Sequence, residues 1–170
     1  MLVRSFVFVI LLHTICIGAS GQTNRIDSLL KFVYAANNEE QKLHAFVNLC
    51  EEYQSMNRDS LDVYGPIIKE LVTKSSNRRN ISLGWLAYAN WYYRWGWSDS
   101  ALVFVEPQIA NNPVSNNATR DVYFKLNRAK AFYHGSKSRF EESLTVLYKI
   151  LPEAETYNDT LNIGLVCNTI

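Results

Sequence analysis

Apolar residues recur at spacings of three and four along nearly the whole chain from residue 26 onward, and no segment alternates convincingly between apolar and polar residues. This spacing places the apolar side chains on one face of a helix. It predicts helices over residues 26–36, 39–55, 59–74, 79–95, 99–110, 118–134, 138–151 and from 158 onward. Clusters of Asn, Ser, Gly and Pro separate these segments, as is typical of short loops. The sequence therefore predicts an all-α fold.

The first 21 residues have a different pattern. Arg4 precedes an apolar run from Phe6 to Ile17, and small residues follow as far as Gly21. This order is typical of a cleavable secretory signal peptide, and the run is shorter than the roughly 20 apolar residues of a membrane-spanning helix. We expect cleavage after Gly21. The mature chain, residues 22–170, is then extracytoplasmic (periplasmic or secreted), with membrane contact only through the signal peptide or a segment beyond this sequence.

The middle of the chain contains the clearest structural unit, which ends at Pro113. Small residues at Ala89 and Ala101 allow two helices to approach closely, and large residues such as Trp85 fill the space around that contact. In chain order the unit contains Trp85, Tyr88, Ala89, Tyr92, Gly96, Trp97, Ala101 and Pro113. This order of bulky, small, aromatic, glycine, small and proline positions resembles the tetratricopeptide repeat.

The same order recurs, less completely, on both sides of the middle unit. The small positions Cys50, Ala89 and Ala129 are 39 and 40 residues apart, whereas the repeat usually spans about 34. We expect the turn from Gly135 to Arg139 to contain two of the extra residues. The resemblance implies that the repeats pack through Cys50, Tyr53, Trp85, Tyr88, Ala89, Tyr92, Ala101, Ala129 and Phe132.

The resemblance also implies the architecture. We expect antiparallel helical hairpins stacked as a short right-handed solenoid, with units near residues 40–76, 79–113 and 120–155 and a partial unit from 158. The last segment ends in the middle of a helix with apolar residues such as Leu165 and no following partner. We therefore expect the chain to be a truncated piece of a longer protein.

In such a solenoid the first helix of each hairpin lines a concave groove. The resemblance projects the groove onto His44, Val47, Glu51 and Gln54; Leu83, Leu86, Asn90, Tyr93 and Arg94; and Tyr123, Leu126, Lys130, Tyr133 and His134. The expected peptide-binding residues are Asn90, Tyr93, Arg94, Lys130, Tyr133 and His134. Cations beside amide donors suit a peptide with a carboxylate or an acidic side chain. The alternative is that these are solvated residues of an unused groove.

Charge and motifs narrow the function further. The chain has 17 basic and 16 acidic residues, and losing Arg4 with the signal peptide leaves the mature chain neutral, which disfavours a nucleic-acid binder. Glu40 and His44 lie one helical turn apart without further metal ligands, and no nucleotide-binding or metalloprotease motif is present. We expect no catalytic residues, no metal and no cofactor. Cys50 and Cys167 are expected to be buried free thiols.

Three functions fit these observations. The first is a non-catalytic scaffold outside the cytoplasm that binds a protein or peptide in the groove. The second is the extracytoplasmic sensor portion of a larger two-component signalling protein, either a histidine kinase or a transcriptional regulator, because degenerate exported repeats are similar to the N-terminal repeat regions of some bacterial regulators. The third is a surface nutrient-binding protein, which the aromatic cluster from Trp85 to Trp97 would suit.

Overall fold

The structure is a computed structural model, and it describes residues 26–53 and 58–170, with the side chains of residues 52–61 outside that description. The signal peptide expected over residues 1–21, Gln54 and the side chain of Tyr53 therefore lie outside the described part. Every regular element within the described ranges is a helix, which confirms the predicted all-α class.

A helical segment over residues 26–35 comes first. It is followed by α2 (Glu39–Tyr53), α3 (Arg58–Lys74), α4 (Arg78–Arg94), α5 (Ser98–Asn111), α6 (Arg120–Gly135), α7 (Phe140–Thr156) and α8 (Thr160–Cys167). Most described ends lie within about two residues of their predicted positions. The exception is α7, which continues through Pro152 to Thr156 instead of ending at 151. Proline removes one backbone donor, but here the flanking turns keep the helix intact.

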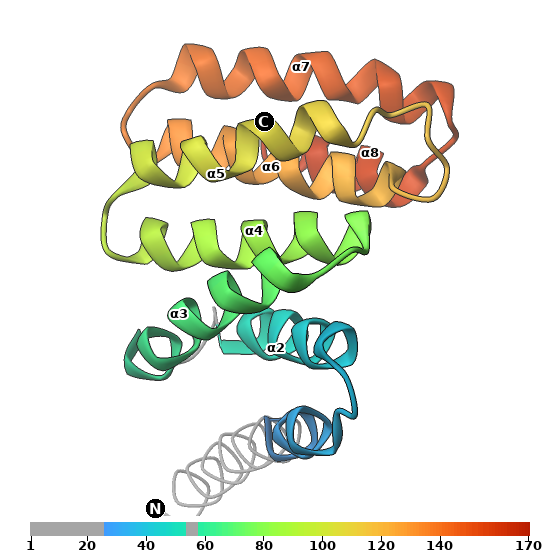
Figure 1. Cartoon of the computed structure of the whole chain (residues 1–170). Coiled ribbons are helices and arrows are strands. Elements are labelled where there is room, and N and C mark those ends of the chain that lie inside the picture. Colours follow the sequence, from blue (N-terminus) through green and yellow to red (C-terminus); the bar gives the residue numbers. More distant parts are fainter. Residues whose placement is uncertain (1–25, 54–57) are drawn as a thin grey trace, which may run out of the picture.

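The helices pack in chain order and form two rows. Each helix from α2 to α7 packs against the next one, while α2 also packs on α4 and α4 on α6. Figure 1 shows this stack, with α7 at one end and α2 near the other. We call α2, α4 and α6 the inner row, because they contact one another as well as their neighbours in sequence. None of the described helices combines the length and apolar character needed to cross a bilayer.

Small residues set the spacing between the helices. Ala89 in α4 and Ala101 in α5 are both fully buried, so these helices approach closely. Trp85 of α4 stacks on Phe104 of α5, with ring centroids 5.4 Å apart. A Cβ atom at Gly84 would overlap Cγ2 of Val72, so glycine is what lets α4 lie against α3. The core therefore runs through the contacts between consecutive helices.

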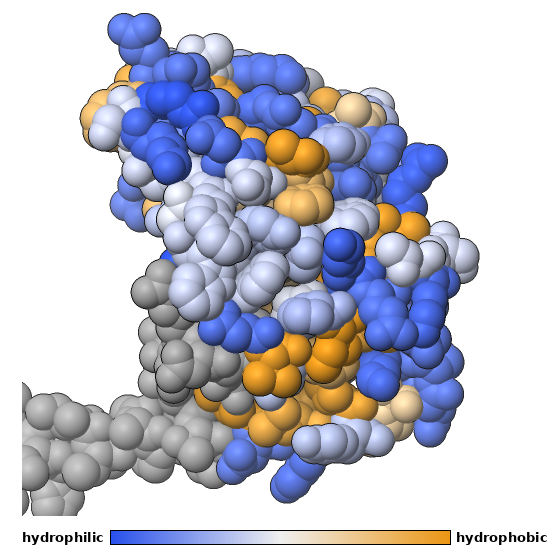
Figure 2. Space-filling model, turned by 60° about the vertical axis from the view of Figure 1, so that its left-hand side comes forward, coloured by the Kyte–Doolittle hydropathy of each residue, from blue (hydrophilic) through white to orange (hydrophobic). Residues whose placement is uncertain are grey.

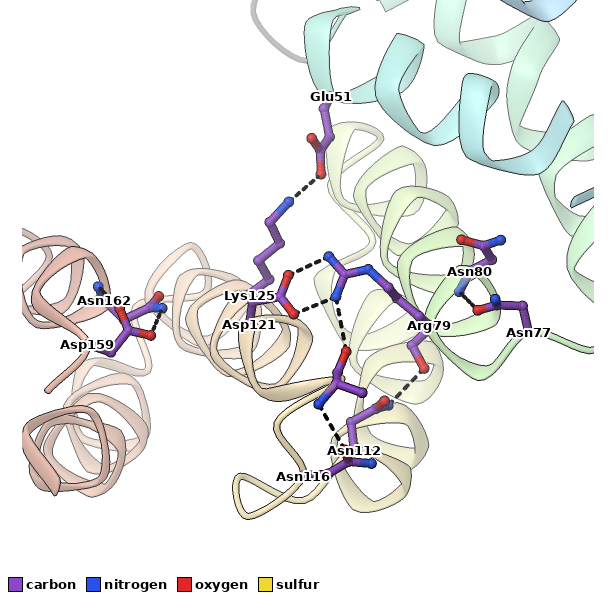
Figure 3. Close-up of polar contacts among 12 residues, drawn as sticks. Glu51, Asn77, Arg79, Asn80, Asn112, Asn116, Asp121, Lys125, Asp159 and Asn162 are labelled. Atoms are coloured by element: carbon purple, nitrogen blue, oxygen red, sulfur yellow. Dashed lines mark hydrogen bonds and ion pairs between the residues drawn. The ribbon is translucent and has the colours of Figure 1, made fainter. Parts of the chain in front are cut away.

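A single carboxylate joins α2 to the loop between α3 and α4. Glu40 Oε1 accepts hydrogen bonds from Ser75 Oγ at 2.7 Å and from the backbone N–H of Ser76 at 2.8 Å, and Glu40 Oε2 accepts one from Asn80 Nδ2 at 2.8 Å. Asn77 caps α4 by accepting from the backbone N–H of Asn80 (Figure 3). These bonds fix where α4 starts relative to α2.

The surface is not uniform. Figure 2 shows that exposed hydrophobic side chains gather mainly in the half of the molecule nearer α2 and α3, whereas the half formed by α6 and α7 is largely hydrophilic. Phe32, Tyr34 and Val63 are among the exposed large apolar residues of the first half.

The second and third helix pairs are offset by 42 residues, not by the 40 that we expected. α4 begins at Arg78 and α6 at Arg120, and α5 begins at Ser98 and α7 at Phe140. The extra length lies in the connection 112–119 between α5 and α6, not in the turn from Gly135 to Arg139. A longer connection advances every position of the third pair by about two residues.

The backbone of the turns shows the same offset. Gly96 has φ of +82° between α4 and α5, and Ser138, 42 residues later, has φ of +59° between α6 and α7. The glycine position of the third unit is thus taken by Ser138, and Gly135 is the last residue of α6. Correspondingly, the fully buried alanine of α6 is Ala131 and not Ala129. The expectation that Ala129 packs the hairpin is wrong for this reason.

Candidate functional site: a groove along the inner row

A groove of about 1000 Å³ runs along the inner row of helices. On each helix its lining residues are three or four positions apart, so they share one face. The lining residues are Val47 and Glu51 of α2; Leu83, Leu86, Ala87, Asn90, Tyr93 and Arg94 of α4; Lys125, Arg128, Ala129 and Phe132 of α6; and Thr169, which follows α8. The volume is at the upper end for ligand sites in proteins.

The floor of the groove is apolar. Val47, Leu83, Leu86 and Ala87 lie at the contact between α2 and α4 and are each less than a tenth exposed. Polar and charged side chains stand further along each helix. An apolar floor with a polar rim is the usual composition of a protein-binding surface.

Aromatic rings form one end of the groove. The ring of Tyr93 stacks on that of Tyr133 at 5.4 Å and lies 5.0 Å from that of Phe132. Tyr133 is fully buried behind this pair, and its hydroxyl donates a hydrogen bond to Asn90 Oδ1 at 2.5 Å. Burial raises the pKa of the Tyr133 hydroxyl, so it remains a donor. Phe132 is 54% exposed and offers a supported apolar ring to a ligand.

The charged groups of the groove are three cations and one carboxylate. Lys125 Nζ of α6 contacts Glu51 Oε1 of α2 at 3.0 Å, which links two helices far apart in sequence (Figure 3). Arg94 and Arg128 are the other cations. The Nε of Arg128 is buried and donates to no residue that the structure describes. Burial lowers the pKa of the Arg128 guanidinium, and the attraction of Asp159 opposes that shift.

Half of the residues predicted for peptide binding line the groove, and half lie elsewhere. Asn90, Tyr93 and Arg94 of α4 line it. Lys130 instead pairs with Glu106 of α5 at 2.7 Å. Tyr133 is buried behind the groove, and the partly buried His134 lies away from its lining, with an Nδ1 that has no hydrogen-bond partner among the described residues.

The 42-residue offset explains these errors. Counted from α4, the positions equivalent to Leu83, Leu86, Ala87 and Asn90 are Lys125, Arg128, Ala129 and Phe132, and these four line the groove. Phe132, expected to pack the hairpin, is therefore exposed in the groove. The sequence analysis missed Lys125 and Arg128 because it placed α6 two residues out of register. The long polar connection after Pro113 was the signal for the correct offset.

The other predicted packing residues lie in or against the core. Tyr88 and Cys50 are buried, while Trp85 and Tyr92 are partly buried and pack against the same cluster. Trp85 is thus occupied by the core and does not offer a free face to a nutrient. Cys167 is an exposed free thiol, contrary to expectation.

Chemically reactive groups are not gathered anywhere in the described part of the chain. Glu40 uses its carboxylate for the loop between α3 and α4, and His44 contacts Asn48 instead. Among residues 26–53 and 58–170, no three His, Cys, Asp or Glu side chains are close enough to hold a metal ion. Burial raises the pKa of the Cys50 thiol to about 12, with the Glu51 charge as a smaller cause.

Known proteins add no name to this geometry. No protein-family model matches the sequence, and a search of curated proteins finds no match.

Proposed function

We propose that this chain is a non-catalytic scaffold that binds a segment of another protein in the groove along α2, α4 and α6. One observation carries the proposal: a continuous groove has an apolar floor, an exposed aromatic end at Tyr93 and Phe132, and charged groups along its rim. Tyr, Phe and Arg are enriched at protein interfaces, and their arrangement along helices suits a chain laid across several helices.

The architecture we propose is a right-handed solenoid similar to that of tetratricopeptide repeats. Consecutive helices pack as pairs, and the first helices of the pairs also contact one another, as expected of stacked hairpins. Offsets of 39 residues from α2 to α4 and 42 from α4 to α6 support a repeated unit longer than the usual one.

The location we propose is extracytoplasmic. Its support is the sequence of residues 1–21, in which Arg4 precedes an apolar run and small residues. A scaffold outside the cytoplasm needs no cofactor supply, which is consistent with the chemistry of the groove.

The test compares two phenylalanines. Random peptides are selected on the processed chain, residues 22–170, and the selected peptides are then measured against Phe132→Ala and Phe140→Ala. Phe132 is 54% exposed in the groove, and Phe140 is 63% exposed at the start of α7, so both changes remove a similar exposed ring. We expect Phe132→Ala to weaken binding about tenfold or more, as truncation of an interface aromatic commonly does. Equal binding to both variants would place the site elsewhere.

A further inference from the structure

The groove binds part of its own charge. The Lys125–Glu51 contact crosses from α6 to α2, with both side chains more than a third exposed. Such exposed pairs are weak, so a competing carboxylate can displace Glu51 at little cost. Glu51 is the one carboxylate among the residues that line the groove.

A second cation stands next to this pair. Arg128 is one helical turn from Lys125, so both side chains project from the same face of α6. Its guanidinium is half-buried, and its Nε has no acceptor among the described residues. A cation that burial makes less stable is stabilised by a carboxylate that enters the groove, because the ion pair replaces the lost solvation.

The apolar contact lies one turn further along the helix. Phe132 follows Arg128 by four residues and stands beside Tyr93. A segment that places a carboxylate at Arg128 therefore brings a neighbouring side chain to the two rings. The lining thus offers two cationic positions followed by an aromatic one along α6.

We propose that the occupant of the groove is an acidic protein segment, in which carboxylate side chains bind Arg128 and displace Glu51 from Lys125 while an adjacent apolar side chain packs on Phe132 and Tyr93. This inference rests on the proposed function and names the chemistry of its partner. The positive charge is local, because the whole chain carries a formal charge of only +1. Glu51 then acts as an internal competitor that neutral and basic segments do not have to displace.

The experiment uses three pools of short peptides with acetylated N-termini and amidated C-termini, so that only side chains supply charge. The pools share the same randomised apolar positions and carry Glu, Gln or Lys at two fixed positions. Retention is measured on the immobilised processed chain, residues 22–170. We expect the Glu pool to be retained best and to lose that advantage as salt is raised.

Two matched variants test the internal competitor. Glu51→Gln should raise retention of the Glu pool about twofold to fivefold, the range of an exposed ion pair, and leave the Gln pool unchanged. Glu106→Gln removes the partner of Lys130 on α5, a similar exposed pair outside the groove, and should change neither pool. Arg128→Gln should abolish the preference for Glu, and Lys125→Gln, at a more exposed position, should reduce it should Arg128→Gln not fold.

Failure of this inference differs from failure of the proposed function. Equal retention of the Glu and Gln pools, both lost with Phe132→Ala, would overturn the acidic occupant and leave the groove as a protein-binding site. An identical response to Glu51→Gln and Glu106→Gln would overturn the competitor. Retention that Phe132→Ala does not change for any pool would instead reject the groove itself.

Discussion

Arg79, the second residue of α4, donates through both terminal nitrogens to the two carboxylate oxygens of Asp121, the second residue of α6, each at 2.5 Å (Figure 3). Arg79 also approaches the carbonyl oxygen of Ala118 at 3.4 Å. The two residues occupy equivalent positions 42 apart, so the pair ties the first turns of two inner helices together. The width of the groove between α4 and α6 depends on this contact.

Replacing Asp121 tests how much the pair stabilises the stack. Asp121→Asn should lower the free energy of unfolding by about 0.5–1 kcal/mol, because the pair has bidentate geometry but both side chains are more than 40% exposed. Urea unfolding followed by circular dichroism measures the loss. Asp99→Asn is the control, because Asp99 is 70% exposed and contacts Arg139 through one bond. A larger loss from Asp99→Asn would contradict this ranking.

The close contact of α4 with α3 predicts that Gly84 tolerates no side chain. A Cβ there overlaps Val72 and lies 3.1 Å from Cδ1 of Leu43, and both neighbours are buried. Gly84→Ala should destabilise the fold by about 1–2 kcal/mol, since overpacking outweighs the better helix propensity of alanine. The thermal unfolding midpoint reports the change.

Gly164 in α8 provides the opposite case. A Cβ at Gly164 meets nothing within 4 Å, so Gly164→Ala should raise stability by up to about 1 kcal/mol through helix propensity alone. If the two substitutions had the same sign, the packing described for α3 and α4 would be wrong.

Glu40 predicts a dependence of stability on acid pH. Hydrogen bonds from the side chains of Asn80 and Ser75 lower the pKa of Glu40 from 4.5 to about 2, with smaller contributions from two backbone N–H groups. Because the folded state favours the charged form, the stabilisation is present above about pH 4.5 and is lost as the pH falls towards 2. The stability gap between the wild type and Glu40→Gln should therefore close over this interval.

The control for this series is Glu141→Gln at the start of α7, which removes an exposed carboxylate whose side chain makes no hydrogen bond to a described residue. Chemical denaturation at a series of acid pH values gives both gaps. A gap for Glu40→Gln that stays constant down to pH 2 would show that the carboxylate does not hold the loop between α3 and α4.

The two thiols of the mature chain should differ in reactivity. Burial raises the pKa of Cys50 to about 12, whereas Cys167 is exposed. A thiol reagent at neutral pH should label Cys167 rapidly and Cys50 only after unfolding, so Cys167→Ser should abolish rapid labelling. Rapid labelling that persists in Cys167→Ser and disappears in Cys50→Ser would place Cys50 at the surface.

The helices were predictable because their apolar spacing is regular and their loops contain strong turn residues. The end of α7 was not, because Pro152 is a reliable helix breaker only when the turns around it are not otherwise held in place. The burial of Ala89 and Ala101 also followed from the sequence, since small residues between large ones mark a close helix contact.

The groove on α6 could not be placed so well, because it depends on the exact offset between repeats. Gly135 attracted the alignment as the obvious turn glycine, while the left-handed turn is formed by Ser138. The resulting shift of two residues moved the expected lining from Lys125 and Arg128 to Lys130 and His134. On a helix, two residues correspond to more than half a turn, so the predicted face pointed the wrong way.

Photo-crosslinking of a selected peptide tests the central claim most directly. A peptide that binds the processed chain, residues 22–170, is given a photoreactive side chain, and the crosslinked residues are identified by mass spectrometry. The account predicts crosslinks on the inner row, at groove residues such as Tyr93, Arg128 and Phe132. Crosslinks confined to α3, α5 and α7 would contradict the proposal that this protein binds its partner in the groove.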